Sequence, residues 1–168
     1  MKCLTIRNPW AAAIVLGHKD VENRTWKAPA GAVGRRFYVH VGQRYDREAV
    51  GAEGVEIHGL PGVGVRGAVI GSVELAGCTP AEDCQLSWCM GRAGSWAWLL
   101  RGARVYREPV AMGGALGLFE PAASVVEALQ RAEAGAEEPA AFMQRWLERQ
   151  RAAAMAAAAD RGELGRLD

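Results

Sequence analysis

The stretch GHKDVENRTW, residues 17–26, concentrates charge directly after the uncharged segment PWAAAIVLG. Apolar and small polar side chains alternate with charged and aromatic ones along it, as they do on the two sides of a β-strand. One side carries Val21, Asn23 and Thr25, and the other carries Asp20, Glu22, Arg24 and Trp26. The pattern predicts a short strand with one strongly polar face.

The segments around this strand predict a mainly β domain with one short early helix. LTIRNPW alternates as a strand and stops at Asn8-Pro9, where Asn is a good cap and Pro fits the first helical turn. We expect a helix over residues 9–16, ended by Gly17. Residues 45–66 predict a short helix and a glycine-rich loop.

Further strands are expected where branched and aromatic residues are bounded by glycine. They are GRRFYVHVG (34–42), AVIGSVELAGC (68–78), a pair within GSWAWLLRGARVY (94–106) and GALGLFEP (114–121). Five or six strands of this kind usually close into a small barrel, which removes exposed sheet edges.

The character of the chain changes after Pro121. Ser124 and Glu127 form a capping box that opens a helix to about Gly135, and a second helix is expected from near Pro139. An apolar stripe follows at helical spacing: Phe142, Met143, Trp146 and Leu147. We expect this stripe to pack on the barrel, with a partner or a second copy of the chain as the alternative. The prediction is an α+β protein, mainly β, with a barrel domain over residues 1–121 and a helical extension over 122–168.

Composition places the chain among soluble globular proteins. It has 168 residues, of which 50% are apolar and 23% charged, and no run of eighteen apolar residues that would span a membrane. The start, MKCLTIRNPW, does not resemble a signal peptide, so a cytoplasmic location is expected. The four cysteines lack the paired spacing of zinc sites. They are expected to be reduced, and neither a metal nor a cofactor is predicted.

The net charge of +1 conceals a strong asymmetry along the chain. Residues 1–50 hold nine Lys or Arg against four Asp or Glu, whereas residues 51–100 hold two against five and residues 101–168 nine against ten. Clustered cations attract phosphate backbones, because neutralised phosphates release their counterions. The alternative is that Arg35, Arg36, Arg44 and Arg47 are only solvated loop residues.

Within the opening stretch, Gly17, Lys19, Glu22 and Arg24 spell GxKxxExR. Together with LTIRNPWA before it, GSVELAGC in the middle and SWAWLLRGARVYREPVAMGGALGLFE at the end, this motif closely resembles the ASCH domain family, whose members are similar to PUA-like β-barrels. The resemblance covers about residues 3–120 in the right order, and the helical tail lies outside it.

The resemblance implies a cleft beside the first helix and the motif strand, and a role near RNA or another nucleic acid. It also implies that some relatives are enzymes: one branch hydrolyses the amide of acetylated cytidine, and another is described as a ribonuclease. The amidohydrolase branch uses a Lys, a Thr three residues later and a Glu on a later strand. Lys19 matches that Lys, Glu22 stands in place of the Thr, and Glu74 is the counterpart of the later Glu.

Charge arguments from the residues themselves point to recognition more than to catalysis. Glu22 and Arg24 share one face of their strand, and Lys19 precedes it at the turn. Two cations beside one carboxylate favour its ionised form, so Glu22 is suited to accept hydrogen bonds rather than to donate a proton. The cations could bind phosphate: Arg24 could form a bidentate pair of hydrogen bonds, and Lys19 could act as a point charge. The structural alternative is an ion-paired face that merely closes the sheet.

The expected ligand-binding residues are Asn8, Trp10, Lys19, Glu22, Arg24, Trp26 and His40, and the catalytic set, if the protein is an enzyme, is Lys19, Glu22 and Glu74. Trp10 and Trp26 could stack on bases or belong to the core. His40 is more readily interpreted as a satisfied interior histidine.

Three hypotheses on function follow. The first is binding of RNA, another nucleic acid or a modified nucleobase by the GxKxxExR cleft. The second is a metal-independent hydrolase acting on a modified nucleoside or on RNA. The third is a protein-interaction module that uses the C-terminal helices, including self-association into a homo-oligomer. The sequence leaves open whether any bond is broken.

Overall fold

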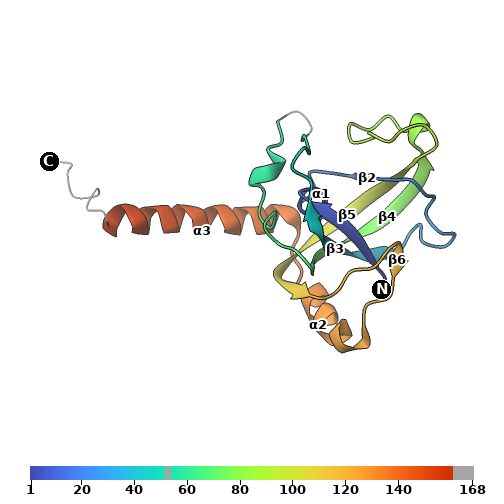
Figure 1. Ribbon diagram of the computed structural model, residues 1–168. Coiled ribbons are helices and arrows are strands. Elements are labelled where there is room, and N and C mark those ends of the chain that lie inside the picture. The colour runs from blue at the N-terminus through green and yellow to red at the C-terminus, as the bar shows by residue number, and fades with distance from the viewer. Residues whose placement is uncertain (52–53, 161–168) are drawn as a thin grey trace.

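The computed structural model describes residues 1–51 and 54–160, which form one six-stranded sheet with helices packed against it (Figure 1). The strands are β1 (Cys3–Asn8), β2 (Val21–Arg24), β3 (Arg36–Tyr45), β4 (Ala68–Pro80), β5 (Trp96–Ala111) and β6 (Leu118–Phe119). The helices are α1 (Trp10–Val15), α2 (Ala123–Ala134) and α3 (Pro139–Asp160), with 3-10 turns at Ile57–Gly59 and Ala81–Asp83.

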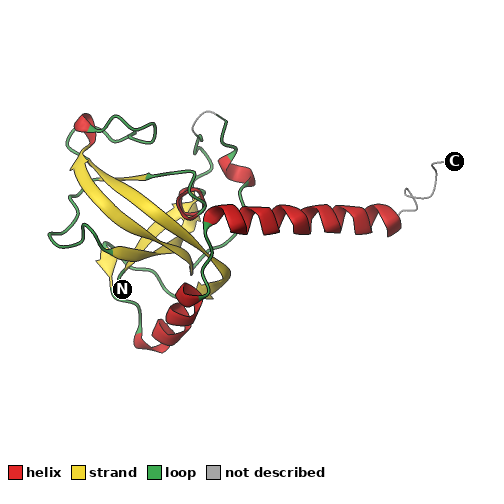
Figure 2. Ribbon diagram, turned by 180° about the vertical axis from the view of Figure 1, so that it is seen from behind, coloured by secondary structure: helices red, strands yellow, loops and turns green. Residues whose placement is uncertain are grey.

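The sheet is open, so the predicted closed barrel is not confirmed. Its strand order is β2-β5-β4-β3-β1-β6, which leaves β2 and β6 as two edges that do not pair with each other. β6 has two residues and pairs only with Cys3 and Leu4. The rest of the β1 edge is therefore left without a ladder, and a side chain of β2 reaches it instead, as described below. The α+β class and the predominance of strands are as expected (Figure 2).

Each face of the sheet has its own apolar core. On one face, here called the α1 face, Leu4, Ile6, Val39 and Trp98 are buried together with α1. On the opposite face, here called the α2 face, the buried cluster is Cys3, Tyr38, Val69, Tyr106 and Leu129, the last of which comes from α2. Successive strand residues alternate between these two environments, as the sequence periodicity predicts.

Residues 94–106 were expected to hold two strands, but β5 is one strand of 16 residues. Gly102 does not make a turn: with φ +57° it lies where the register against β4 shifts between Ser72 and Glu74. A glycine in the left-handed region is typical of a bulge, which adds a residue to one strand and bends it without ending it.

Local bonds fix α1 and the start of the motif. Asn8 Oδ1 accepts a hydrogen bond from the Ala12 amide at 3.0 Å and so holds the first turn of α1. The N-cap position is Pro9, without a side-chain cap, so the predicted cap at Asn8 is one residue too early. Gly17, with φ +74°, ends the helical segment. The Lys19 amide then donates to the Ala13 carbonyl at 3.0 Å, which holds Lys19 against the helix and directs the chain into β2.

The C-terminal helices differ from the prediction at one end. α2 begins at Ala123 and is preceded by Ala122, with no side-chain cap, so Ser124 lies in the first turn and the predicted capping box is wrong. α3 begins at Pro139 as expected. Its first turns lie against the domain, where Phe142 and Met143 pack on the α1-face core. The remainder of α3 extends away from the sheet (Figure 1), and self-association through it stays a prediction.

Two of the four cysteines are paired. Cys84 and Cys89 form a disulfide, with their Cα atoms 5.9 Å apart, whereas Cys3 and Cys78 are free. The expectation of four reduced thiols is therefore wrong for this pair, because the turn after Ala81–Asp83 brings the two residues within disulfide range. No helix in the described part of the chain is both long and apolar enough to cross a membrane.

Candidate nucleic-acid interface

The polar face of β2 carries one carboxylate between two cations, as the alternation predicted. Glu22 Oε2 lies 3.3 Å from Lys19 Nζ, and Glu22 Oε1 lies 3.4 Å from Arg24 Nε. Lys19 Nζ also donates to the carbonyl of Val21. The solvent-exposed fraction of the side chain decreases along this trio, from 23% for Arg24 to 11% for Glu22 and 3% for Lys19.

Burial governs the chemistry of Lys19. Desolvation lowers the pKa of Lys19, and the charge and hydrogen bond of Glu22 partly oppose that shift. A buried ammonium with a bound carboxylate and carbonyl has little capacity left for a ligand. Lys19 is therefore placed to hold Glu22, rather than to meet a phosphate directly.

Arg24 bridges the open side of the sheet. Its Nη2 donates to the carbonyl of Thr5 on β1 at 2.9 Å. We call the gap between β2 and the unpaired part of the β1 edge the seam, and the line of contacts from Lys19 through Glu22 and Arg24 to Thr5 spans it. The sequence also allowed a purely structural role, in which ion pairs on this face close the sheet. That interpretation describes the buried pair of Lys19 and Glu22 well.

Two tryptophans accompany the cations of the trio. The ring of Trp10 lies 5.7 Å from Lys19 Nζ, and the ring of Trp26 lies 6.0 Å from the Arg24 guanidinium. Trp26 packs edge-on against the buried Trp98 with ring centres 4.7 Å apart. Both Trp10 and Trp26 are partly exposed, so each has a core contact and some accessible surface.

Sequence reasoning missed the partners that hold this arrangement from elsewhere in the chain. Asp46 accepts the indole N–H of Trp10 at 3.0 Å. Asn23 donates to the Trp88 carbonyl at 2.9 Å and accepts from the Met90 amide at 3.2 Å, which fixes the loop before β5 over β2. Asp46, Trp88 and Met90 belong to no motif, and no local periodicity links them to residues 17–26.

Two predicted ligand residues are instead interior and satisfied. Asn8 is fully buried, and its Nδ2 donates to the carbonyls of Gly62 and Val65 while its oxygen holds the first turn of α1. His40 is 2% exposed and bonds to Thr5 Oγ1 and the Met112 carbonyl. Burial lowers the pKa of His40, so it is neutral near pH 7.

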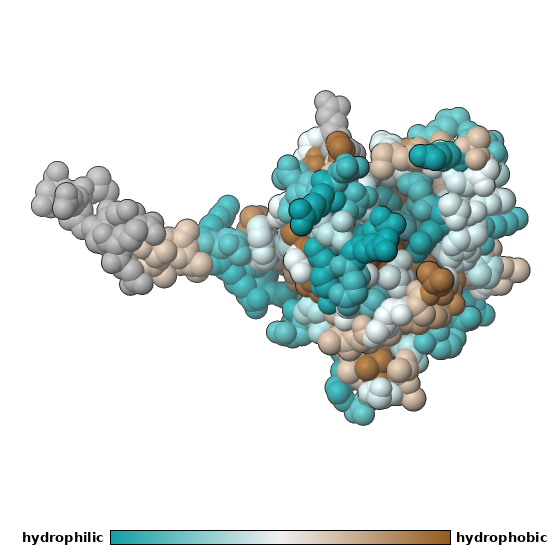
Figure 3. Space-filling view, in the orientation of Figure 1, coloured by the Kyte–Doolittle hydropathy of each residue, from teal (hydrophilic) through white to brown (hydrophobic). Residues whose placement is uncertain are grey.

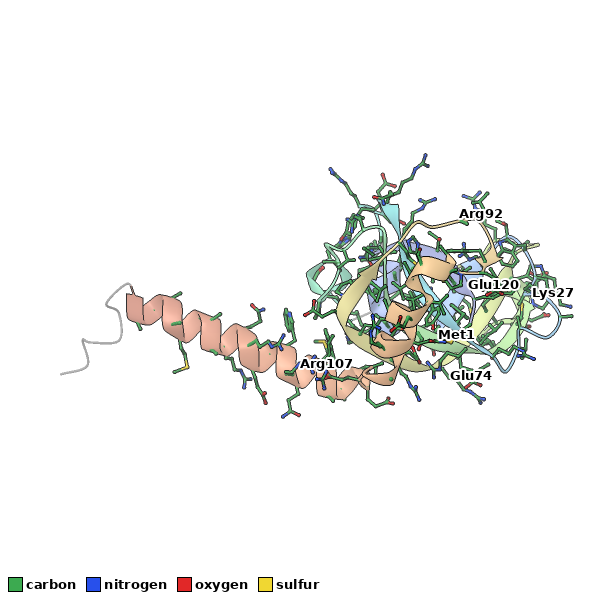
Figure 4. The ribbon with its side chains drawn as sticks, turned by 90° about the horizontal axis from the view of Figure 1, so that it is seen from below. Met1, Lys27, Glu74, Arg92, Arg107 and Glu120 are labelled. Atoms are coloured by element: carbon green, nitrogen blue, oxygen red, sulfur yellow. A yellow bond between two sulfur atoms is a disulfide. The ribbon has the colours of Figure 1, made fainter. Side chains whose placement is uncertain are left out.

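The structure does not bring Glu74 to Lys19 and Glu22. Leu75 belongs to the α1-face core, so its neighbour Glu74 points to the α2 face, where Arg101 donates to it. Figure 4 shows Glu74 and Arg92, which belongs to the loop before β5, on opposite sides of the molecule. The predicted set of Lys19, Glu22 and Glu74 therefore does not form one catalytic group.

Several exposed basic residues have no acidic partner in the part of the chain that the structure describes. Among the described residues, no ion pair involves these exposed cations: Arg7, Lys27, Arg44, Arg47 and Arg92. By contrast, the arginines of β5 and several on the C-terminal helices pair with glutamates. The face shown in Figure 3 is largely hydrophilic, with only scattered apolar patches.

No cluster of metal-ligating side chains is found in residues 1–51 and 54–160. Two cavities of about 570 and 210 Å³ lie elsewhere, and neither is lined by a member of the Lys19–Glu22–Arg24 trio. The cleft expected beside these residues is neither of these two cavities and stays a prediction.

The model of the ASCH domain matches residues 4–91, more than half of the 168-residue chain, and includes the seam strands β1 and β2. The chain belongs to the ASCH domain family. This family is generally thought to bind RNA. No curated protein matches the chain.

One solved ASCH structure supports the fold assignment. The crystal structure of ASCH from Zymomonas mobilis is similar, with a TM-score of 0.50, 16% identity, and coverage of 82% of this chain and 96% of that one. Two point mutants of the Zymomonas mobilis protein each give a TM-score of 0.48 and 17% identity over 77% of this chain, covering 94% and 96% of theirs. At these identities the likeness concerns the fold alone.

Proposed function

We propose that this ASCH domain binds RNA, or another ligand that presents a nucleobase, along the seam between β1 and β2. The observation that carries the proposal is the family match over residues 4–91, which contains the seam and also Arg7, a cation without an acidic partner among the described residues. Cations without acidic partners are free to neutralise phosphates, and the release of counterions then favours binding.

The exposure gradient divides the roles within the motif. Arg24 and Trp26 are the accessible members, so they contact the ligand: the guanidinium donates to phosphate or a base edge, and the indole offers a surface on which a base stacks. Lys19 and Glu22 are buried beneath Arg24 and do not contact the ligand; they fix the position of Arg24. Asn8 and His40 support the surrounding backbone rather than the ligand.

The proposal is tested by fluorescence anisotropy with a labelled single-stranded RNA over a range of salt concentrations. Arg24→Gln and Trp26→Ala are each expected to weaken binding by about tenfold, since a phosphate contact or a stacked base is worth about 1–3 kcal/mol. Arg131→Gln, which removes an exposed arginine of α2, is the matched control and should change nothing.

Circular dichroism of each variant separates loss of binding from loss of fold. RNA affinity that is unchanged in both seam variants, at every salt concentration, contradicts the proposal. Affinity that falls equally in Arg131→Gln contradicts it too, because binding would then follow net charge alone.

A second candidate is hydrolysis of a modified nucleoside, and the lowered pKa of Lys19 is the observation that favours it. Desolvated lysines serve as bases and nucleophiles in some enzymes. Turnover of acetylated cytidine by the metal-free protein, lost in Lys19→Arg, would support this candidate. Absence of turnover in the wild-type protein removes it, and the separation of Glu74 from Lys19 makes that the expected result.

A further inference from the structure

The larger cavity, of about 570 Å³, lies apart from the seam. It is lined by the start of the chain, the loop before β3, the start of β3 and the β6 region: Met1, Lys2, residues 29–32, Arg35, Arg36, Phe37, Leu118 and Glu120. Figure 4 shows two of these residues, Met1 and Glu120, near each other on the underside of the molecule. We propose that this cavity binds a small organic anion that carries a flat ring.

The charge of the lining favours an anion. Three cations, Lys2, Arg35 and Arg36, face a single carboxylate, Glu120. Lys2 Nζ lies 3.9 Å from Glu120, and both side chains are more than half exposed, so this ion pair is weak and easily rearranged. The residues of the lining therefore carry more positive than negative charge.

The two arginines differ in how many of their guanidinium nitrogens are bonded to the protein. Arg36 is fixed by bonds from Nη1 to Ser72 Oγ at 2.9 Å and from Nη2 to the Gly102 carbonyl at 2.7 Å, so its terminal nitrogens are already engaged by the protein. Arg35 donates only Nε, to the Gly31 carbonyl at 2.9 Å. That bond orients the guanidinium and leaves its two terminal nitrogens for a carboxylate or phosphate, which they match in geometry.

The remaining surface of the cavity is apolar and suits a ring. Phe37 is almost fully buried at 3% exposure, and Pro29, Ala30, Ala32 and Leu118 complete the apolar lining. The volume lies in the range of small-molecule sites, which combine apolar walls with a few polar groups that fix orientation. A nucleoside monophosphate and an aromatic carboxylate share this chemistry.

Isothermal titration calorimetry on the full chain tests the inference with three probes: adenosine monophosphate, 2-naphthoate and uncharged adenosine. At least one anion is expected to bind with a Kd below about 1 mM, and adenosine at least about tenfold more weakly. The tighter of the two anions identifies the source of the ligand. Arg35→Gln should weaken anion binding about tenfold or more, whereas Arg131→Gln should leave it unchanged.

A second variant, Ala30→Trp, fills the cavity without altering its charge and should abolish anion binding while circular dichroism stays unchanged. Absence of binding by both anions overturns the inference, as does equal affinity for adenosine. Anion binding that survives Arg35→Gln but is lost in Arg24→Gln also overturns it, because the ligand would then sit at the seam. Failure of RNA binding leaves these outcomes untouched.

Discussion

Arg24 on β2 donates a hydrogen bond to the carbonyl of Thr5 on β1, and this side-chain contact occupies the place where a closed barrel would have a backbone ladder. The same guanidinium lies 3.4 Å from Glu22, so the bridge between the strands is anchored at both ends. One residue thus joins the edge of the sheet and also forms the accessible end of the motif.

Replacing Arg24 by Met should therefore lower stability as well as RNA affinity. A hydrogen bond from a charged donor to a partly buried acceptor contributes about 1.5–3 kcal/mol, so a loss of about 2 kcal/mol in the free energy of unfolding is expected. Urea denaturation followed by tryptophan fluorescence measures it. A change smaller than the error of the extrapolation would show that the bridge contributes nothing to the fold.

The buried pair of Lys19 and Glu22 should be strongly coupled. Glu22→Gln alone is expected to cost about 3–5 kcal/mol, since it leaves the Lys19 ammonium buried without a carboxylate. Lys19→Met should cost less, because Glu22 keeps its contact with Arg24. The double variant should cost less than the sum, with a coupling of about 1–3 kcal/mol. The exposed pair of Arg131 and Glu127 on α2 is the control, and its coupling should stay below about 0.5 kcal/mol. Additive losses at Lys19 and Glu22 would mean that the pair does not act as a unit.

His40 should make the protein less stable in mild acid. Its pKa in the folded protein is lowered below the ordinary value of 6.5 by burial, so below that pH the unfolded chain takes up a proton that the folded protein excludes. The stability present above pH 6.5 is therefore lost as the pH falls through the folded pKa. Thermal unfolding from pH 7.5 to 5 should show a smaller decrease in His40→Asn than in the wild-type protein. Parallel curves for the two proteins would exclude His40 as the source.

Gly102 should not tolerate a side chain. Its φ of +57° disfavours other residues, and an added Cβ would lie 3.1 Å from Arg36 Nη2. Gly102→Ala is expected to reduce the free energy of unfolding by about 1–2 kcal/mol, the cost of placing a residue with a Cβ in the left-handed region. Gly113→Ala is the control, because nothing lies within 4 Å of its added Cβ. Equal stabilities for the two variants would contradict the bulge interpretation.

Local chemistry made much of the seam predictable. Alternation along residues 17–26 placed Glu22 beside Arg24, and Asn8-Pro9 and Gly17 marked the two ends of the helix to within a residue or two, because each signal depends on residues a few positions apart. Local sequence signals gave wrong predictions where the same residue type is compatible with two different structures. Gly102 serves a bulge as readily as a turn, and Ser124 fits the first turn of α2 as readily as its cap.

Contacts between residues far apart in the chain could not be predicted from the sequence pattern. Asp46 meets Trp10 across 36 positions and Trp88 meets Asn23 across 65, and only the folded sheet brings these residues together. Each bulge in a strand changes which face of the sheet the following residues occupy. The register of β4 shifts at several points, and Glu74 lies on the face opposite to the motif, where it bonds Arg101.

The strand order also determines which fragments of this chain can fold. β5 begins at Trp96, after the segment that matches the family ends at residue 91, yet within the described residues it is the sole ladder partner of β2, and it also pairs with β4. A fragment cut at residue 91 would leave the motif strand without any backbone pairing. During synthesis β2 therefore stays unpaired until β5 has left the ribosome, whereas β1 can pair with β3 before that and gains its short second partner, Leu118–Phe119, last.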